Sequence, residues 1–154
     1  MAEQDLTSVL DESGVDYELL PHPHTETAAA EAKALGLDPQ EVAKTLVLST
    51  PGGYVRAVLP ASDRIDLSKV REQVEGGKRI HLASEEDLQR DYPGFDLGAV
   101  PPFGGTGDRV LVDATLARQE TVVLEAGSHE QSVRLQTADL LKLTRADVVD
   151  LVQD

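Results

Sequence analysis

The sequence predicts an α/β protein of the α+β type, with a mixed, largely antiparallel sheet or a barrel-like core and flanking helices. Two observations lead to this prediction. Short apolar runs typical of strands are interspersed with helix-forming segments along the chain. Neighbouring strands are joined by short turns at two places, which favours hairpins over a doubly wound parallel sheet. Because 154 residues without a linker or repeat suit one core, we expect a single domain, residues 1–154.

The first half of the chain alternates helices and strands. Gly14 and Gly36 are placed to end two helices, and the sequence TPGG is a turn between two strands. The hairpin strands have alternating faces, as expected for a half-buried pair. The expected elements are a helix over 3–13, a strand over 17–20, a helix from Thr25 or Thr27 to Gly36, and strands over 42–49 and 54–60.

The second half continues the alternation. Ser84 with Asp87 three residues later resembles a capping box, and a glycine- and proline-rich loop spans residues 92–107. The expected elements are a helix over 66–77, a strand over 79–83, a helix over 84–91, and strands over 109–113, 121–125 and 132–136. Residues 137–143 and 145–152 are expected to form one broken helix or two short helices.

Composition limits the possible partners. The chain has 14 Lys and Arg against 28 Asp and Glu, a net charge of −14, so it exerts no overall attraction on DNA or on an anionic membrane. No segment approaches the roughly 18 apolar residues of a membrane span, and the N-terminus lacks the pattern of a signal peptide. The absence of cysteine excludes thiol catalysis and agrees with a cytoplasmic protein.

Common catalytic motifs are absent from the sequence. It contains no Walker A sequence, no GxGxxG after a strand and no GxSxG elbow. The four histidines lack HExxH spacing. His22 and His24 in the sequence HPH could hold a metal ion, but these residues are more simply the extended entry to a helix. We therefore expect neither a metal nor a cofactor.

Two features are unusual in physical terms. Lys44 lies within the apolar strand EVAKTLVL, where desolvation of an ammonium costs several kcal/mol unless its pKa falls or an anion binds. A lysine whose stem packs while its head reaches water is the simpler alternative. The loop GAVPPFGG, residues 98–105, is small and rigid, and its amides can face a carbonyl or phosphate. A purely structural turn is the alternative there.

Six segments, in this order, resemble the YbaK/prolyl-tRNA synthetase-associated domain family: HTETAAAEAKALG, EVAKTLVL, YVRAVLPASDRIDLSKV, HLASEEDL, DLGAVPPFGG and GSHEQSVRLQTADLLKL. The resemblance covers nearly the whole chain, from about Leu6 to Leu151. The family includes the editing insertion of bacterial prolyl-tRNA synthetase and free-standing proteins that hydrolyse mischarged aminoacyl-tRNA. It implies the YbaK/prolyl-tRNA synthetase insertion-domain fold and an enzyme that hydrolyses aminoacyl-tRNA esters.

The resemblance also implies roles for individual residues. Lys44 is expected to engage the 3′-terminal adenosine end of the tRNA, and the backbone of Gly98, Ala99 and Val100 to hold the reacting ester. Direct attack by water is expected, because no Ser-His-Asp constellation is visible. Contacts to the bound substrate are expected from a larger set: Thr45, Pro101, Pro102, Phe103, Gly104, His129 and Thr25.

The amino acid on the tRNA stays open between Ala, Cys and Ser, with tRNA(Pro) as the expected carrier. Thr45 after the lysine resembles the cysteine-directed members, whereas Val100, Pro101 and Pro102 stand where those members carry Ser-Pro. His129 resembles a histidine of the members that act on alanyl esters, although an exposed turn histidine is the alternative. These indications disagree about the substrate.

Two further classes of function remain as alternatives: a silent module that binds aminoacyl-adenosine or a nucleotide, and a protein-interaction domain with an acidic docking face. The expected partners are aminoacyl-tRNA and an aminoacyl-tRNA synthetase. Because the chain is acidic, we expect a synthetase or an elongation factor to deliver the tRNA. The nearest approach to a basic cluster comprises residues more simply interpreted as solvated charges: Arg56, Arg64, Lys69, Arg71, Lys78 and Arg79.

Overall fold

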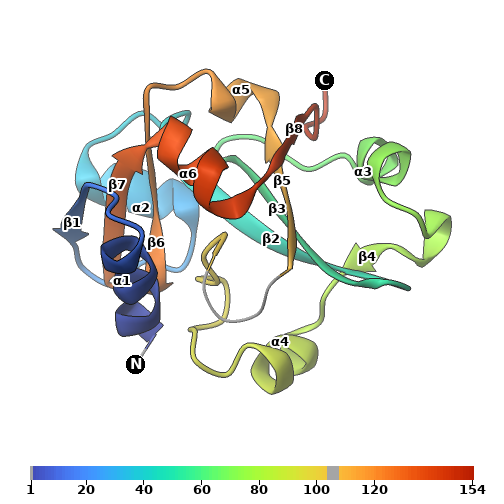
Figure 1. Cartoon of the computed structure of the whole chain (residues 1–154), viewed down its shortest axis with the longest axis horizontal. Coiled ribbons are helices and arrows are strands. Elements are labelled where there is room, and N and C mark those ends of the chain that lie inside the picture. Colours follow the sequence, from blue (N-terminus) through green and yellow to red (C-terminus); the bar gives the residue numbers. More distant parts are fainter. Residues whose placement is uncertain (1, 104–107) are drawn as a thin grey trace.

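Eight strands form two sheets in residues 2–103 and 108–154, the part of the chain that the structure, a computed structural model, describes (Figure 1). The smaller sheet has the order β1-β7-β6 and the larger one β4-β2-β3-β5-β8. The strands are β1 (Tyr17–Pro21), β2 (Ala43–Thr50), β3 (Gly53–Pro60), β4 (His81–Leu82), β5 (Arg109–Asp113), β6 (Thr121–Ser128), β7 (Gln131–Gln136) and β8 (Asp147–Val149).

The prediction of a mixed, largely antiparallel architecture is confirmed. All pairings of the smaller sheet are antiparallel, and β2 pairs antiparallel with both β3 and β4. Within the two described sheets, the strand pairings of β5 are parallel, with β3 on one side and β8 on the other. The two sheets touch at a parallel bridge between Val42 and Val123. No closed barrel forms in the described parts of the chain, so the barrel-like alternative is wrong.

Helices flank both sheets (Figure 1). The helix α1 contacts β6, and α5 and α6 lie near β5 and the C-terminal strand. None of the helices in the described residues is long and apolar enough to cross a membrane. Their bounds are α1 (Ala2–Glu12), α2 (Ala28–Leu35), α3 (Leu67–Gln73), a 3₁₀ turn (Gly77–Arg79), α4 (Glu85–Asp91), α5 (Ala114–Ala117) and α6 (Thr137–Thr144).

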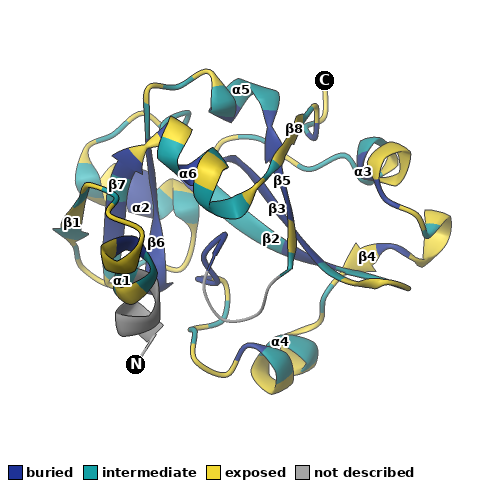
Figure 2. Ribbon diagram, viewed as in Figure 1, coloured by how far each residue is buried: buried dark blue, intermediate teal, exposed yellow. Residues whose placement is uncertain are grey.

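The main core lies between the two sheets, because apolar side chains from both meet there (Figure 2). Burial of such side chains is the main favourable term in folding. Strands of the larger sheet supply Ala43, Val58, Val110 and Val112, and strands of the smaller one supply Val122, Leu124, Val133 and Leu135.

The last segment differs from the prediction. Residues 145–152 were expected to form a helix, but Arg145 has a left-handed backbone conformation, φ 52°, which ends α6. The next residues form β8, which pairs with β5 and extends the larger sheet. Val148 and Val149 are β-branched and suit a strand, and the open edge of β5 decides between the two structures. This choice depends on tertiary pairing and is not visible in the local sequence.

The caps of two helices agree with the sequence. Thr27, rather than Thr25, caps α2, because its side chain accepts from the Ala30 N–H, and Gly36 ends that helix with φ 69°. Ser84 and Asp87 form the capping box of α4. The first turn of α2 is thereby fixed beside β2, where the cavity described next lies.

Candidate active site

A cavity of about 270 Å³ lies where the first turn of α2, the start of β2 and the loop after α4 meet. Its wall is mostly apolar and built of small side chains. Among the described residues, one basic and one acidic side chain line it, Lys44 from β2 and Glu125 from β6. The complete lining is Thr27, Ala28, Ala29, Ala43, Lys44, Thr45, Leu46, Ala61, Gly98, Ala99, Val100 and Glu125.

Lys44 is half-buried at the cavity wall, opposite Leu59 of β3 in the strand register. Within the described residues its ammonium makes no hydrogen bond and no ion pair. Burial lowers the pKa of Lys44, an effect that the neighbouring Asp63 opposes and Arg64 reinforces. An anion that entered the cavity would therefore meet a cation with no partner of its own.

The loop Gly98–Val100 forms another part of the cavity wall. Gly98 has φ 82°, a conformation that residues with a side chain rarely adopt. The Ala99 N–H donates to the Asp96 carbonyl at 3.0 Å and so closes the turn. The amides of Gly98 and Val100 have no partner among the residues described. Two of the three predicted amides thus remain for a ligand.

A buried arginine holds the far end of this loop. Arg56 of β3 is 1% exposed, and its Nη1 donates to the Pro101 carbonyl at 2.7 Å. Its Nε donates to Asp108 at 3.1 Å, and its guanidinium lies 5.2 Å from the centre of the Tyr92 ring. The Tyr92 hydroxyl donates to the same Asp108 carboxylate. This network of hydrogen bonds and the ion pair fixes the loop at Pro101.

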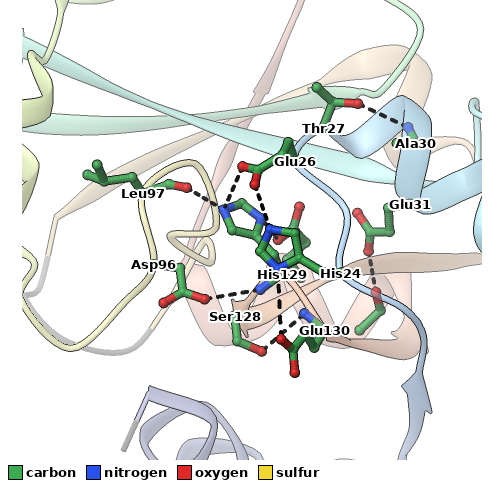
Figure 3. Close-up of polar contacts among 12 residues, drawn as sticks. His24, Glu26, Thr27, Ala30, Glu31, Asp96, Leu97, Ser128, His129 and Glu130 are labelled. Carbon is green, nitrogen blue, oxygen red and sulfur yellow. Dashed lines mark hydrogen bonds and ion pairs between the residues drawn. The ribbon is translucent and has the colours of Figure 1, made fainter.

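His129 holds the near end of the loop (Figure 3). Its Nε2 donates to the Leu97 carbonyl, and its backbone N–H donates to Asp96 at 3.2 Å. The ring is 5% exposed and lies against Gly98, where an added Cβ would be 3.5 Å from the ring Cε1. An irregularity in the β6–β7 pairing between Glu125 and Ser128 brings the histidine to this position.

Two buried glutamates lie close enough for the charge of one to act on the other, and the second, Glu125, contacts His129. Glu31 of α2 accepts a hydrogen bond from Ser132, and burial raises its pKa to about 7. Glu125 is 8% exposed, and burial together with the charges of Glu31, Asp96 and Glu26 raises its pKa to about 9. Near neutral pH the Glu125 carboxyl is therefore protonated while the cavity is empty.

The structure brings together five of the predicted site residues. Lys44, Thr45, Gly98, Ala99 and Val100 line the same cavity.

The other predicted site residues lie outside its lining. His129 is packed behind Gly98, and Thr25 is tied to it through a backbone hydrogen bond, Thr25 N–H to the His129 carbonyl. Pro101 and Pro102 are buried, and Phe103 packs into the main core. Gly104 lies outside the described residues.

Sequence reasoning missed the acidic wall of the site and the first turn of α2. Thr27, Ala28 and Ala29 line the cavity, but the sequence identifies them only as a helix start. Glu125 is a carboxylate at the end of an apolar strand, TVVLE. That is the same kind of signal that singled out Lys44, and it was available in the sequence.

Three of the six residues in the suggested basic cluster are engaged within the fold. Arg56 is buried beneath the loop, so its inclusion was wrong. Lys69 is paired with Asp150 and Asp154, and Arg71 donates to the Gly77 carbonyl. Arg56, Lys69 and Arg71 thus serve the fold, and the simpler interpretation as solvated charges suits the exposed Arg64, Lys78 and Arg79.

A family model described as the aminoacyl-tRNA editing domain matches residues 22–143. The chain belongs to this family. The resemblance seen in the sequence is thereby confirmed, and so is the class of activity, hydrolysis of aminoacyl-tRNA esters, at the level of the family. The match spans α2, the Lys44 strand, the loop at Gly98 and His129, so every described part of the cavity lies within the editing domain.

Individual relatives support the same assignment to the editing-domain family. The chain is 30% identical to the multifunctional Ser/Thr-tRNA deacylase ProXp-y of Escherichia coli K12, over 97% of this chain and 92% of that protein. It is 23% identical to the proline–tRNA ligase of Thermosipho melanesiensis, over 75% of this chain but only 20% of the ligase.

A solved structure of a candidate trans-editing enzyme for prolyl-tRNA synthetase superposes with a TM-score of 0.89 at 27% identity. The superposition covers 99% of this chain and 98% of that protein. The predicted fold is thereby confirmed.

Proposed function

We propose that residues 1–154 form a single editing domain that acts in trans and hydrolyses the ester of a small amino acid mischarged on tRNA, most simply tRNA(Pro). One observation carries the proposal: Lys44 and the Gly98–Val100 loop line the same small cavity. The likeness to a stand-alone deacylase over nearly its full length, and to only a fifth of a ligase, supports action in trans.

Lys44 binds the anionic end of the substrate. A cation in a low-dielectric cleft attracts an anion more strongly than one in water. The 3′-terminal nucleotide supplies a phosphate, and the ester oxygen gains negative charge as water attacks. Binding of either group compensates the desolvation that lowers the pKa of Lys44 in the empty cavity.

The loop amides bind the developing oxyanion. Gly98 and Val100 are the two candidates, since the Ala99 amide is used by the turn. A single preorganised donor of this type contributes roughly 3 kcal/mol in other enzymes. Arg56 and His129 hold the two ends of the loop and thereby keep these amides in place.

The cavity selects by size. Its volume of about 270 Å³ lies at the lower end of ligand sites, which start near ~300 Å³. Alanine side chains and backbone form much of the wall, which admits alanyl, cysteinyl or seryl groups and excludes larger ones. Such a second sieve is needed because one methylene provides only about 1–3 kcal/mol of discrimination.

The name of the Escherichia coli relative adds one candidate to the list of substrates. That protein is named for Ser/Thr-tRNA, and threonine exceeds serine by one methyl group. Serine is common to this name and to the expectation from the sequence. We therefore place seryl-tRNA first among the substrates to be tested, with alanyl-, cysteinyl- and threonyl-tRNA after it.

The reaction as proposed needs only water and the chain's own groups. We expect it in the cytoplasm, on tRNA brought by a synthetase or an elongation factor, because the net charge of −14 repels a free polyanion. The contact is limited to the 3′-terminal adenosine end. Binding to DNA or to a membrane is not expected.

The test is a panel of Ser-, Ala-, Cys- and Thr-charged tRNA(Pro) with the wild type and Lys44→Ala. We expect hydrolysis of at least one ester, and a loss of about tenfold or more in the variant, equivalent to 1.4 kcal/mol of barrier. Lys33→Ala removes an exposed lysine of α2 and serves as the matched control. If no ester is cleaved faster than in buffer but the tRNA end still binds, the protein is the silent binding module.

A further inference from the structure

Glu125 is an unpaired acid in the wall of the cavity. Its Oε2 is buried and has no hydrogen-bond partner among the described residues. Nδ1 of His129 lies 3.1 Å away, a contact that is an ion pair only when the ring is protonated, and no hydrogen bond joins the two atoms. Buried polar atoms are nearly always paired, so an orphan at a cavity wall indicates a missing ligand group.

The neighbouring groups show what kind of ligand atom is missing. Glu31 of α2, Asp96 of the loop and Glu26 before α2 all act on Glu125 with negative charge. His129 uses Nε2 to donate to a carbonyl, so in the neutral ring its Nδ1 is an acceptor as well. Acceptors and negative charge thus surround this point, and a donor that carries positive charge is the complementary group.

Lys44 does not fill this role. No ion pair joins Lys44 and Glu125 in the described part of the chain, and the charges that shift the pKa of Glu125 come from other carboxylates. The charges that shift the pKa of Lys44 come from Asp63 and Arg64. The cavity therefore has two separate poles, one basic and one acidic, in an otherwise apolar wall.

We propose that Glu125 binds the α-ammonium group of the aminoacyl ester, while Lys44 binds the phosphate or ester end of the same substrate. This assignment rests on the proposed function, and it identifies the substrate group that the acidic pole of the cavity recognises. An aminoacyl-adenosine end carries one cationic and one anionic group at opposite sides of the ester. Its charges match the two poles of the cavity.

Binding then couples to proton release. The carboxyl of Glu125 is protonated in the empty site, since burial and three neighbouring carboxylates raise its pKa to about 9. An entering ammonium favours the carboxylate, so the carboxyl proton leaves to solvent and one N–H of the ammonium donates to Oε2. A substrate with a hydroxyl in place of the ammonium provides no such charge and leaves the carboxyl protonated.

The test uses two non-hydrolysable ligands, 3′-deoxyadenosine 5′-phosphate carrying a 3′-seryl amide and the same compound with a hydroxyl in place of the α-ammonium. Calorimetry with the full chain measures both dissociation constants and, in two buffers of different ionisation enthalpy, the protons released. We expect the wild type to prefer the ammonium ligand by roughly tenfold to a hundredfold. We also expect proton release near pH 7 with that ligand alone.

Glu125→Gln keeps the shape of the side chain without its charge and should reduce both the preference and the proton release. Glu120→Gln is the matched control, since Glu120 directly precedes the same strand, is exposed, does not line the cavity and is not among the charges that act on Glu125. It should keep both signatures. Circular dichroism confirms that each variant is folded.

An unchanged preference in Glu125→Gln overturns the assignment, and so does a variant that alters only the choice between seryl and alanyl ligands. Hydrolysis of seryl-tRNA(Pro) by the wild type, measured in parallel, separates the two proposals. If hydrolysis occurs and the preference is unaffected by the variant, only the role of Glu125 fails. If the wild type neither hydrolyses nor binds, the deacylase proposal fails and this inference with it.

Discussion

Two buried charged side chains flank the same loop, and their surroundings are opposite. Arg56 has a carbonyl, a carboxylate and an aromatic ring within reach, and all of them belong to the fold. Glu125 has an orphan oxygen, three repelling carboxylates and a cavity in front of it. The partners of Arg56 stabilise the fold. The surroundings of Glu125 lower stability and are explained by what the cavity is to bind.

The comparison also distinguishes two uses of polarity in one small protein. A buried ion is tolerated when its partners are close and fixed, whereas a buried acid without partners takes up a proton instead. Stability measurements should therefore respond in opposite directions when the two side chains are neutralised. Two predictions test this contrast and a third tests the loop that the two side chains flank, in order of decreasing effect.

The largest effect is expected for Arg56→Met, which keeps the apolar stem and removes the charge. Asp108 and the Pro101 carbonyl lose their buried donor, and loss of one member of a buried pair costs about 3–5 kcal/mol. Urea denaturation measures the loss. Arg109→Met is the control, because its pair with Asp147 is exposed and should contribute less than about 1 kcal/mol. Equal losses in the two variants would refute the structural role of Arg56.

The second effect is the slope of stability with pH, which is the change in unfolding free energy per pH unit. Glu31 and Glu125 have a pKa of about 7 and about 9 in the fold, above the ordinary value of 4.5. The folded state therefore holds more protons than the unfolded state above pH 4.5. Stability should be greatest below that pH and fall as the pH rises through 7 and then 9, by up to about 1.4 kcal/mol per unit for each group.

Glu125→Gln should reduce the decrease in stability between pH 4.5 and about pH 9. Glu31→Gln should reduce it only between pH 4.5 and about pH 7. Denaturation at a series of pH values between 5 and 9 provides the comparison. A wild type whose stability rises with pH over this range would contradict the assignment of protonated carboxyls.

The smallest effect is expected for Gly98→Ala. Alanine at φ 82° is strained by roughly 1–2 kcal/mol, although its Cβ would meet His129 only at ordinary contact distance. Relief of that strain should turn the loop amides and lower kcat/KM for seryl-tRNA. Gly14→Ala has a similar φ of 69°, open space around it and a place remote from the cavity. It should lose similar stability and keep full activity, and a parallel loss of activity in both variants would show that the loop has no special role.

Much of the fold could be predicted because local signals and tertiary structure agree. Gly36 ends α2, the turn TPGG joins β2 and β3, and Ser84 caps α4, as their chemistry requires. The prediction failed where pairing between distant strands decides the secondary structure. The strand β8 forms on the open edge of β5, and nothing within residues 145–152 reports that edge.

The candidate site was predicted in part for the same reason. Lys44 and the Gly98 loop are unusual within their own segments, so they could be singled out without coordinates. Glu125 gives a weaker signal, one carboxylate at a strand end, and its meaning depends on Glu31 and Asp96, which come from distant parts of the chain. The buried role of Arg56 likewise depends on Pro101 and Asp108, which fold back over β3.

The central claim is that one cavity holds the aminoacyl end between a basic and an acidic pole. The most direct measurement is a crystal structure of the protein with the 3′-seryl amide of 3′-deoxyadenosine 5′-phosphate. We predict the α-ammonium at hydrogen-bonding distance from Glu125, the amide carbonyl at the loop of Gly98, and the anionic end towards Lys44. A ligand bound instead in the separate groove beside Tyr54 and Arg109, or with its ammonium in solvent, would contradict the account.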